Sequence, residues 1–130
     1  MSYKNSDIKK VMKKKDLSAS LESVKDRIFQ SNYPREKLHF IKMDVRNQND
    51  LRNIVEGNII ILRLDTDFYD STLASLNSLY SKVVKNGFII HDDYGHWKGS
   101  KKAVDEYFNL NQNFLWFHRI DYASRLYIKQ

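Results

Sequence analysis

The sequence contains no cysteine, one proline and four glycines among its 130 residues. The absence of cysteine excludes disulfides, thiolate metal sites and a cysteine nucleophile, so a metal site in this chain must use oxygen or imidazole ligands. No apolar run is long enough to span a bilayer, and no apolar signal-peptide segment follows Met1. We therefore expect a cytoplasmic protein with no membrane partner.

Positive charge is concentrated at the start of the chain. Six lysines and one aspartate fall within residues 1–15 and account for five of the six net positive charges. We interpret residues 1–16 as a lysine-rich extension and residues 17–130 as one α/β domain, since 42% hydrophobic residues suit a globular chain of this length. The remainder is near neutral, so nucleic acid is not an expected partner.

Helix and strand patterns alternate along the chain, which predicts an α/β fold. Helices are predicted around Ile8–Met12, from Ser18 or Ser20 to Asn32, over Asn47–Val55, from an Asp70 or Ser71 cap to a left-handed stop at Asn86-Gly87, and from a Ser100 cap through Phe108. Strands are predicted at Leu38–Met43, Asn58–Leu64 and Phe88–His91, followed by an antiparallel hairpin of Phe114–Ile120 with Arg125–Lys129. The isoleucine-rich run before Leu64 is typical of a central strand that is covered on both faces.

Four aspartates follow two of the predicted strands. Asp65 and Asp67 come after the first strand, and Asp92 and Asp93 come after the next. A right-handed crossover brings the carboxyl ends of such strands to one edge of a parallel sheet, where α/β folds bind ligands. Adjacent unpaired carboxylates raise one another's pKa, so a divalent cation or a ligand is expected among them. Arg63, the nearest basic residue in the sequence, is expected to point elsewhere.

Aromatic residues flank this acidic edge: Tyr69, Tyr94, His96 and Trp97. Rings with one polar atom suit a pocket for a polar ring such as a sugar, although the same residues can instead pack on their own helix. His96 is a candidate base or ligand. The other histidines, His39, His91 and His118, lie inside predicted strands and are interpreted as packing or edge residues.

Three segments resemble a known family in order and spacing: LRLDTDFYDST, LYSKVVKNGFIIHDDYGHWKGSKKAVDEYF and RIDYASRLYIK. Over about residues 20–130 the chain is similar to the carboxyl-terminal half of the macrocin O-methyltransferase-like family, class I enzymes that use S-adenosylmethionine and act on sugar hydroxyls. The resemblance implies a partial Rossmann-like class I sheet. It would be mostly parallel, with a C-terminal antiparallel hairpin, and would lack the first two strands of the family order 3-2-1-4-5-7-6.

The resemblance also implies site residues. Asp65, Asp92 and Asp93 would hold Mg²⁺ together with oxygens of a sugar-containing acceptor. Asp65 or His96 would take the hydroxyl proton, and the acceptor would contact Tyr69, Tyr94 and Trp97. Asp44 is the one expected contact to S-adenosylmethionine, because all four glycines lie after residue 56 and the family's glycine-rich turn has no counterpart.

The missing strands leave several outcomes open. Leu38–Met43 is expected to pair directly with the Ile59–Leu64 strand, or the edge of that strand is expected to bind a second copy or a partner chain. The expected function is that of an O-methyltransferase that is truncated and can be inactive on its own. One alternative is a non-catalytic assembly module. The other is a nucleotide-sugar glycosyltransferase, in which Asp65-Thr66-Asp67 would be the metal-binding DxD motif.

Overall fold

The computed structural model describes residues 19–110 and 116–130, which fall into two compact units. The first unit ends at Ile41, and the second runs from Lys42 to Gln130. The predicted helix around Ile8–Met12 and the lysine-rich extension lie outside the described residues. Within those residues, no helix is both long enough and apolar enough to cross a membrane.

The first unit contains helix α2 (Leu21–Phe29) and a short 3₁₀ helix, η2 (Arg35–Lys37). The predicted N-terminal cap is confirmed, because the Ser20 hydroxyl accepts a hydrogen bond of 3.1 Å from the Ser23 amide. The predicted strand Leu38–Met43 is wrong. Its backbone is extended at Leu38, but none of the described strands pairs with it. An apolar pattern alone does not make a strand when no neighbour takes its backbone hydrogen bonds.

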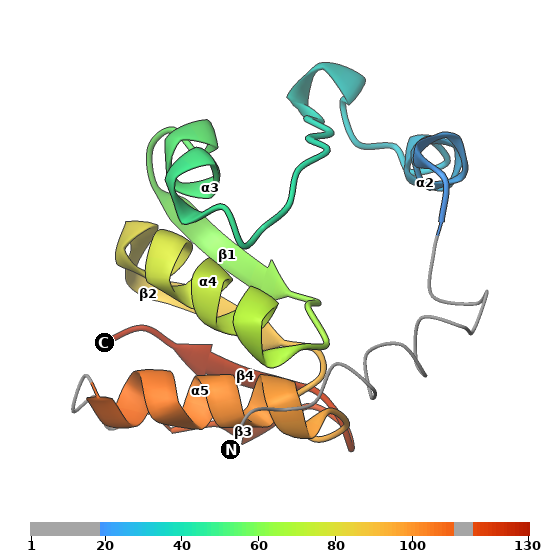
Figure 1. The fold of residues 1–130 in the computed structure, drawn as a ribbon. Coiled ribbons are helices and arrows are strands. Elements are labelled where there is room, and N and C mark those ends of the chain that lie inside the picture. Colours follow the sequence, from blue (N-terminus) through green and yellow to red (C-terminus); the bar gives the residue numbers. More distant parts are fainter. Residues whose placement is uncertain (1–18, 111–115) are drawn as a thin grey trace. The chain divides into compact units, whose positions relative to one another are not determined.

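The second unit is an α/β domain (Figure 1). Its elements are α3 (Gln48–Ile54), β1 (Ile59–Leu64), α4 (Tyr69–Leu79), η3 (Tyr80–Lys82), β2 (Val83–His91), α5 (Lys98–Leu110), β3 (His118–Arg119) and β4 (Arg125–Ile128). The sheet order is β1-β2-β4-β3, with β1 and β2 parallel and β4 antiparallel to both of its neighbours. This is the order 4-5-7-6 of the predicted sheet, so the predicted partial class I fold with its C-terminal hairpin is confirmed.

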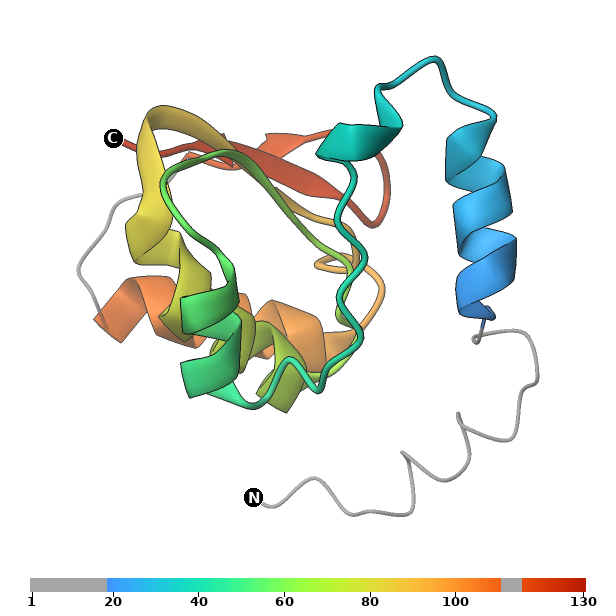
Figure 2. The same ribbon diagram turned by 90° about the horizontal axis from the view of Figure 1, so that it is seen from above.

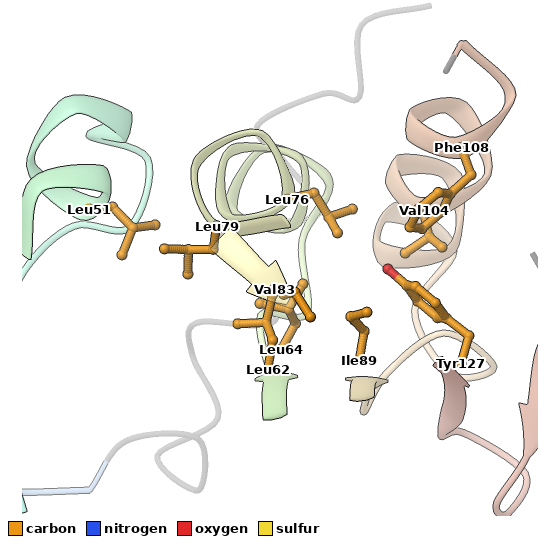
Figure 3. Packing of buried hydrophobic residues seen from close by; sticks show 10 residues of the cluster. All are labelled: Leu51, Leu62, Leu64, Leu76, Leu79, Val83, Ile89, Val104, Phe108 and Tyr127. Carbon is orange, nitrogen blue, oxygen red and sulfur yellow. The ribbon is translucent and has the colours of Figure 1, made fainter. Parts of the chain in front are cut away.

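One face of the sheet carries the hydrophobic core. Helices α3, α4 and α5 lie on the same side of the strands in Figure 2. Figure 3 shows the buried side chains that fill the space between the helices and the sheet: Leu51, Leu62, Leu64, Leu76, Leu79, Val83, Ile89, Val104, Phe108 and Tyr127. Alternate residues of β1, β2 and β4 point into this core, as the period of a strand requires. The core therefore fixes the register in which the strand ends meet.

Strand β1 is an edge strand in the described fold, not a central one. Only β2 pairs with it among the described strands, and its Ile60 and Ile61 are 66% and 62% exposed. Ile61 lies opposite Phe88, which is itself 39% exposed, on the face away from the core. The predictions of direct pairing with Leu38–Met43 and of cover on both faces are therefore wrong, because the described residues cover one face only.

Helix boundaries differ from the prediction near the site. Helix α4 begins at Tyr69, after a Phe68 cap with no side-chain hydrogen bond, and ends at Leu79. Asn86 does have a positive φ of 64°, but inside β2, near a register shift in its pairing with β1. Val83 continues the apolar spacing of the helix but is a buried residue of β2, so the spacing predicted a helix that extends too far. Helix α5 begins at Lys98, so Ser100 lies within it and is buried.

Candidate functional site

The carboxyl ends of β1 and β2 meet at one edge of the sheet. The amide of Asp92 donates to the carbonyl oxygen of Leu64 at 2.9 Å, which joins the two strand ends. Beyond them, Asp65, Asp67 and Asp93 each offer a carboxylate oxygen, and these oxygens lie within 4.8 Å of one another. We call these three residues the carboxylate cluster. Two adjacent strands thus supply an oxygen-only donor set.

The start of α4 holds the Asp65–Asp67 turn in place. The carbonyl oxygen of Thr66 accepts hydrogen bonds from the hydroxyls of Ser71 at 2.8 Å and Thr72 at 3.1 Å. Thr72 is fully buried between α4 and its neighbours. The turn that carries two of the carboxylates is therefore tied to the core by side chains of the next helix.

Asp93 is the residue of the cluster whose chemistry is most altered. Burial, its hydrogen bond with Asp67 and the nearby charges of Asp67, Asp65 and Asp92 raise the pKa of Asp93 to about 7. Its buried Oδ2 has no hydrogen-bond partner among the described residues. Close carboxylates resist joint ionisation, which is the physical reason that the pKa of Asp93 is raised here. The donor set, with one unsatisfied buried oxygen, fits a hard divalent cation.

Arg63 lies across the edge of the cluster. Its Nη2 is 2.8 Å from Oδ1 of Asp92 and 3.1 Å from Oδ2 of Asp65. The expectation that Arg63 points away from the aspartates is wrong, because its long side chain reaches from β1 to the turn after β2. Its hydrogen bond to Asp92 is the main reason that the pKa of Arg63 is raised. Asp92 therefore faces a cation that the chain itself supplies, and a metal-binding role for it stays a prediction.

The two predicted tyrosines are turned toward α5. Tyr69 donates its hydroxyl to Glu106 and Tyr94 donates to Asp105, each at 2.6 Å. Tyr94 also stacks on Phe117 with ring centroids 5.5 Å apart. Their phenolic oxygens thus hold the loops at the sheet edge to a helix, as in the packing alternative, and a role in binding acceptor stays a prediction.

The remaining predicted residues divide into two groups. The backbone amides of His96 and Trp97 donate to the carbonyl oxygen of Asp93 at 3.1 and 2.9 Å, so both residues lie beside the carboxylate cluster. Asp44 is not part of the cluster. Its carboxylate binds the guanidinium of Arg46, with Nε at 2.9 and 3.1 Å, and this contact lowers the pKa of Asp44 to about 2.

Comparison with known proteins identifies the family. The sequence matches the macrocin O-methyltransferase (TylF) family over residues 2–129. The chain belongs to this family. Over 49 residues it is 47% identical to demethyldecarbamoylnovobiocin O-methyltransferase of Streptomyces niveus, a match that covers 38% of the chain and 19% of that protein. The predicted family resemblance is confirmed.

Two solved structures show how much of the TylF-family fold the chain contains. The O-methyltransferase NovP superposes with a TM-score of 0.79 at 28% identity, covering 87% of this chain and 46% of NovP. The MycE methyltransferase of the mycinamycin pathway, solved with Mg, SAH and mycinamycin VI, has a TM-score of 0.55 at 14% identity. That match covers 69% of this chain and 31% of MycE, and it shows the fold alone. The chain thus spans less than half the length of these relatives.

Sequence reasoning missed Tyr122, a neighbour of the site in this TylF-family chain that is distant in sequence. Tyr122 lies in the turn between β3 and β4, and its hydroxyl is 2.9 Å from Nδ1 of His96. The two residues are 26 positions apart, so no local spacing links them. The predicted hairpin was the available signal, because its turn had to lie beside the end of the strand that it pairs with.

Proposed function

We propose that this chain forms the metal- and acceptor-binding half of a magnesium-assisted O-methyltransferase, with S-adenosylmethionine as methyl donor and a sugar-like hydroxyl as acceptor. The observation that carries the proposal is the convergence of Asp65, Asp67 and Asp93 from two strand ends. Membership of the TylF family supports the reaction class. The presence of Mg, SAH and mycinamycin VI in the MycE structure supports the choice of cofactors and a hydroxylated acceptor.

The residues present fit a magnesium ion. Asp65, Asp67 and Asp93 would hold it, and the unpartnered oxygen of Asp93 would gain a ligand. When bound, such an ion orients an acceptor hydroxyl and lowers its pKa. Asp65 stays the first candidate base for the acceptor hydroxyl proton, as the resemblance implies. His96 is the second candidate base, and Nε2 is the ring nitrogen that its contact with the Tyr122 hydroxyl does not use.

The residues expected to bind S-adenosylmethionine do not form a binding site for it. Asp44 is engaged by Arg46, and all four glycines lie after residue 56, so the sequence offers no glycine-rich turn near a first strand. We therefore derive no step that this chain performs on S-adenosylmethionine. The proposal assigns to the chain the metal and acceptor side of the reaction.

Calorimetric titration with Mg²⁺ tests the proposal. Asp93→Asn and Asp67→Asn should each weaken Mg²⁺ binding by more than about tenfold, because a charged oxygen ligand is lost. Asp70→Asn is the matched control, since Asp70 is an exposed aspartate in the first turn of α4 outside the cluster. Asp92→Asn should keep the wild-type affinity, because the Asp92 carboxylate lies outside the cluster and pairs with Arg63. A loss equal to that of Asp93→Asn would instead make Asp92 a ligand, as the resemblance implies.

One result of the Mg²⁺ titration would refute the metal site. Mg²⁺ affinity that is the same in wild type, Asp65→Asn, Asp67→Asn and Asp93→Asn would show that the cluster holds no metal. The glycosyltransferase alternative is not retained, because Asp93 from a second strand joins Asp65 and Asp67 and the family is one of methyltransferases.

A second role has its own supporting observation. The unpaired edge of β1, with Ile60 and Ile61 more than half exposed, supports an assembly function in which another polypeptide extends the sheet. Exposed apolar edge strands without proline or inward-pointing charge pair readily with other strands. This role is compatible with the first, because the carboxylate cluster lies at the strand ends and not along the edge.

A further inference from the structure

Four aromatic side chains form a continuous patch beside the carboxylate cluster. We call it the aromatic patch: Phe68, His96, Trp97 and Tyr122. The ring of Trp97 lies 4.9 Å from that of His96 and 6.3 Å from that of Phe68, and His96 lies 5.7 Å from Tyr122, measured between centroids. The patch combines residues from three separate turns. It is therefore a product of the fold and not of one local motif.

The patch is open to solvent, although aromatic rings usually gain stability by burial. Phe68 is 36% exposed, Tyr122 is 64% exposed and His96 is exposed as well, while Trp97 between Phe68 and His96 is half-buried. By contrast, Tyr69 and Tyr94 direct their hydroxyls to carboxylates of α5. The aromatic patch thus offers ring surface that the described fold does not cover.

Backbone contacts hold the patch next to the acidic edge. His96 and Trp97 both donate their amides to the carbonyl oxygen of Asp93, and Phe68 directly follows Asp67. The turn that carries Tyr122 is fixed by the Gly95 amide, which donates to Ala123 at 2.7 Å. Gly95 permits this approach, because a Cβ there would lie 2.0 Å from the carbonyl oxygen of Tyr122. The loops that carry the carboxylates thus also carry Phe68, His96 and Trp97.

We propose that the aromatic patch is the acceptor platform, on which a pyranose ring lays its apolar C–H face while its hydroxyls meet the carboxylate cluster. This rests on the proposed function and assigns acceptor contact to Phe68 and Tyr122, with Trp97 and His96. A sugar ring has one face of C–H groups and a rim of hydroxyls, so it matches rings beside oxygen ligands. The hydroxyl of Tyr122, bonded to His96, orients that imidazole toward the acceptor.

Saturation-transfer NMR with two probes, methyl β-D-glucopyranoside and 4-nitrophenyl β-D-glucopyranoside, tests the platform on the full chain. Trp97→Ala and Tyr122→Ala should weaken both glycosides by roughly two- to tenfold, the loss of one aromatic contact. Tyr122→Phe, which keeps the ring, should retain binding. Trp116→Ala and Tyr33→Ala are matched controls, because these residues are 82% and 54% exposed and lie outside the patch.

Magnesium titration of the same variants separates this inference from the proposed function. If the variants bind Mg²⁺ as wild type does but bind the glycosides more weakly, the platform is supported. If the wild-type chain has no Mg²⁺ affinity and its glycoside binding still depends on the patch, the platform is supported and the metal site is refuted. Equal glycoside binding in wild type, Trp97→Ala and Tyr122→Ala overturns the platform. A loss of binding confined to the nitrophenyl probe also overturns it, because the patch would then bind an aryl group and not a sugar ring. Glycoside binding by Tyr122→Phe that is as weak as that of Tyr122→Ala overturns it as well.

Discussion

At the scale of single residues, His91 and Asp93 near the end of β2 have pKa values shifted in opposite directions. Burial lowers the pKa of His91 to about 3, and burial with neighbouring carboxylates raises that of Asp93 to about 7. His91 is 1% exposed, stacks on Tyr127 at 5.6 Å, and has no hydrogen-bond partner for either ring nitrogen among the described residues. It is a neutral core residue, in agreement with the packing role expected for it.

This burial predicts an acid-sensitive contribution to stability. Because His91 gains its proton more readily in the unfolded chain, stability falls as the pH drops below its ordinary pKa of 6.5 and continues to fall toward a pH of about 3. At about pH 5 the loss is roughly 2 kcal/mol, since each unit of pKa difference corresponds to about 1.36 kcal/mol. Asp93 acts in the opposite sense, since its raised pKa favours the folded state on the acid side.

Urea unfolding from neutral to acid pH measures the effect. Between pH values of about 7 and 5, the unfolding free energy of His91→Phe should increase relative to that of wild type by roughly 2 kcal/mol, because the Asp93 contribution is common to both proteins. His39→Phe, at an exposed histidine, is the matched control. Parallel pH profiles for wild type and His91→Phe would show that His91 is protonated or hydrated in the folded protein.

At the scale of elements, the sequence predicted the strands that pair in the sheet. It also predicted a strand at Leu38–Met43, which the structure does not contain. The isoleucine run of β1 and strand β4 were located correctly, because apolar periodicity and a polar turn mark them. The predicted strand Phe114–Ile120 is a strand only at His118–Arg119, and its residues 114 and 115 lie outside the described residues. Leu38–Met43 has the same apolar character but lacks a neighbouring strand. The end of α4 was placed too late, because Tyr80 and Val83 keep a helical spacing through the 3₁₀ turn into β2.

The open edge of β1 predicts self-association. Sedimentation velocity at increasing protein concentration should show wild-type dimers or larger species, formed by strand pairing across Ile60 and Ile61. Ile61→Lys should shift the distribution toward monomer, because a charge on the open face opposes edge pairing. Ile41→Lys is the control, as Ile41 is 53% exposed and lies in the first unit. A wild-type monomer at all concentrations would remove the support for an assembly role.

At the scale of the whole molecule, topology does most to create the site. The carboxylates of Asp65 and Asp93 were expected together from the βαβ rule alone, since adjacent parallel strands end at one edge. The reach of Arg63, the position of Asp92 outside the cluster and the contact of Tyr122 with His96 depend on side-chain conformations and on a distant turn, which periodicity does not encode. The chain carries this edge within a match that covers 46% of the length of NovP.

In the proposed function, two strand ends form a cation site from Asp65, Asp67 and Asp93. Anomalous diffraction from crystals grown with Mn²⁺, a substitute for Mg²⁺ with the same preference for oxygen ligands, tests it most directly. We expect one anomalous peak within ligand distance of oxygens of these three carboxylates, and we expect this peak to be absent in Asp93→Asn crystals. A peak held elsewhere, or an Mn²⁺-saturated crystal with no peak among the three carboxylates, would contradict it.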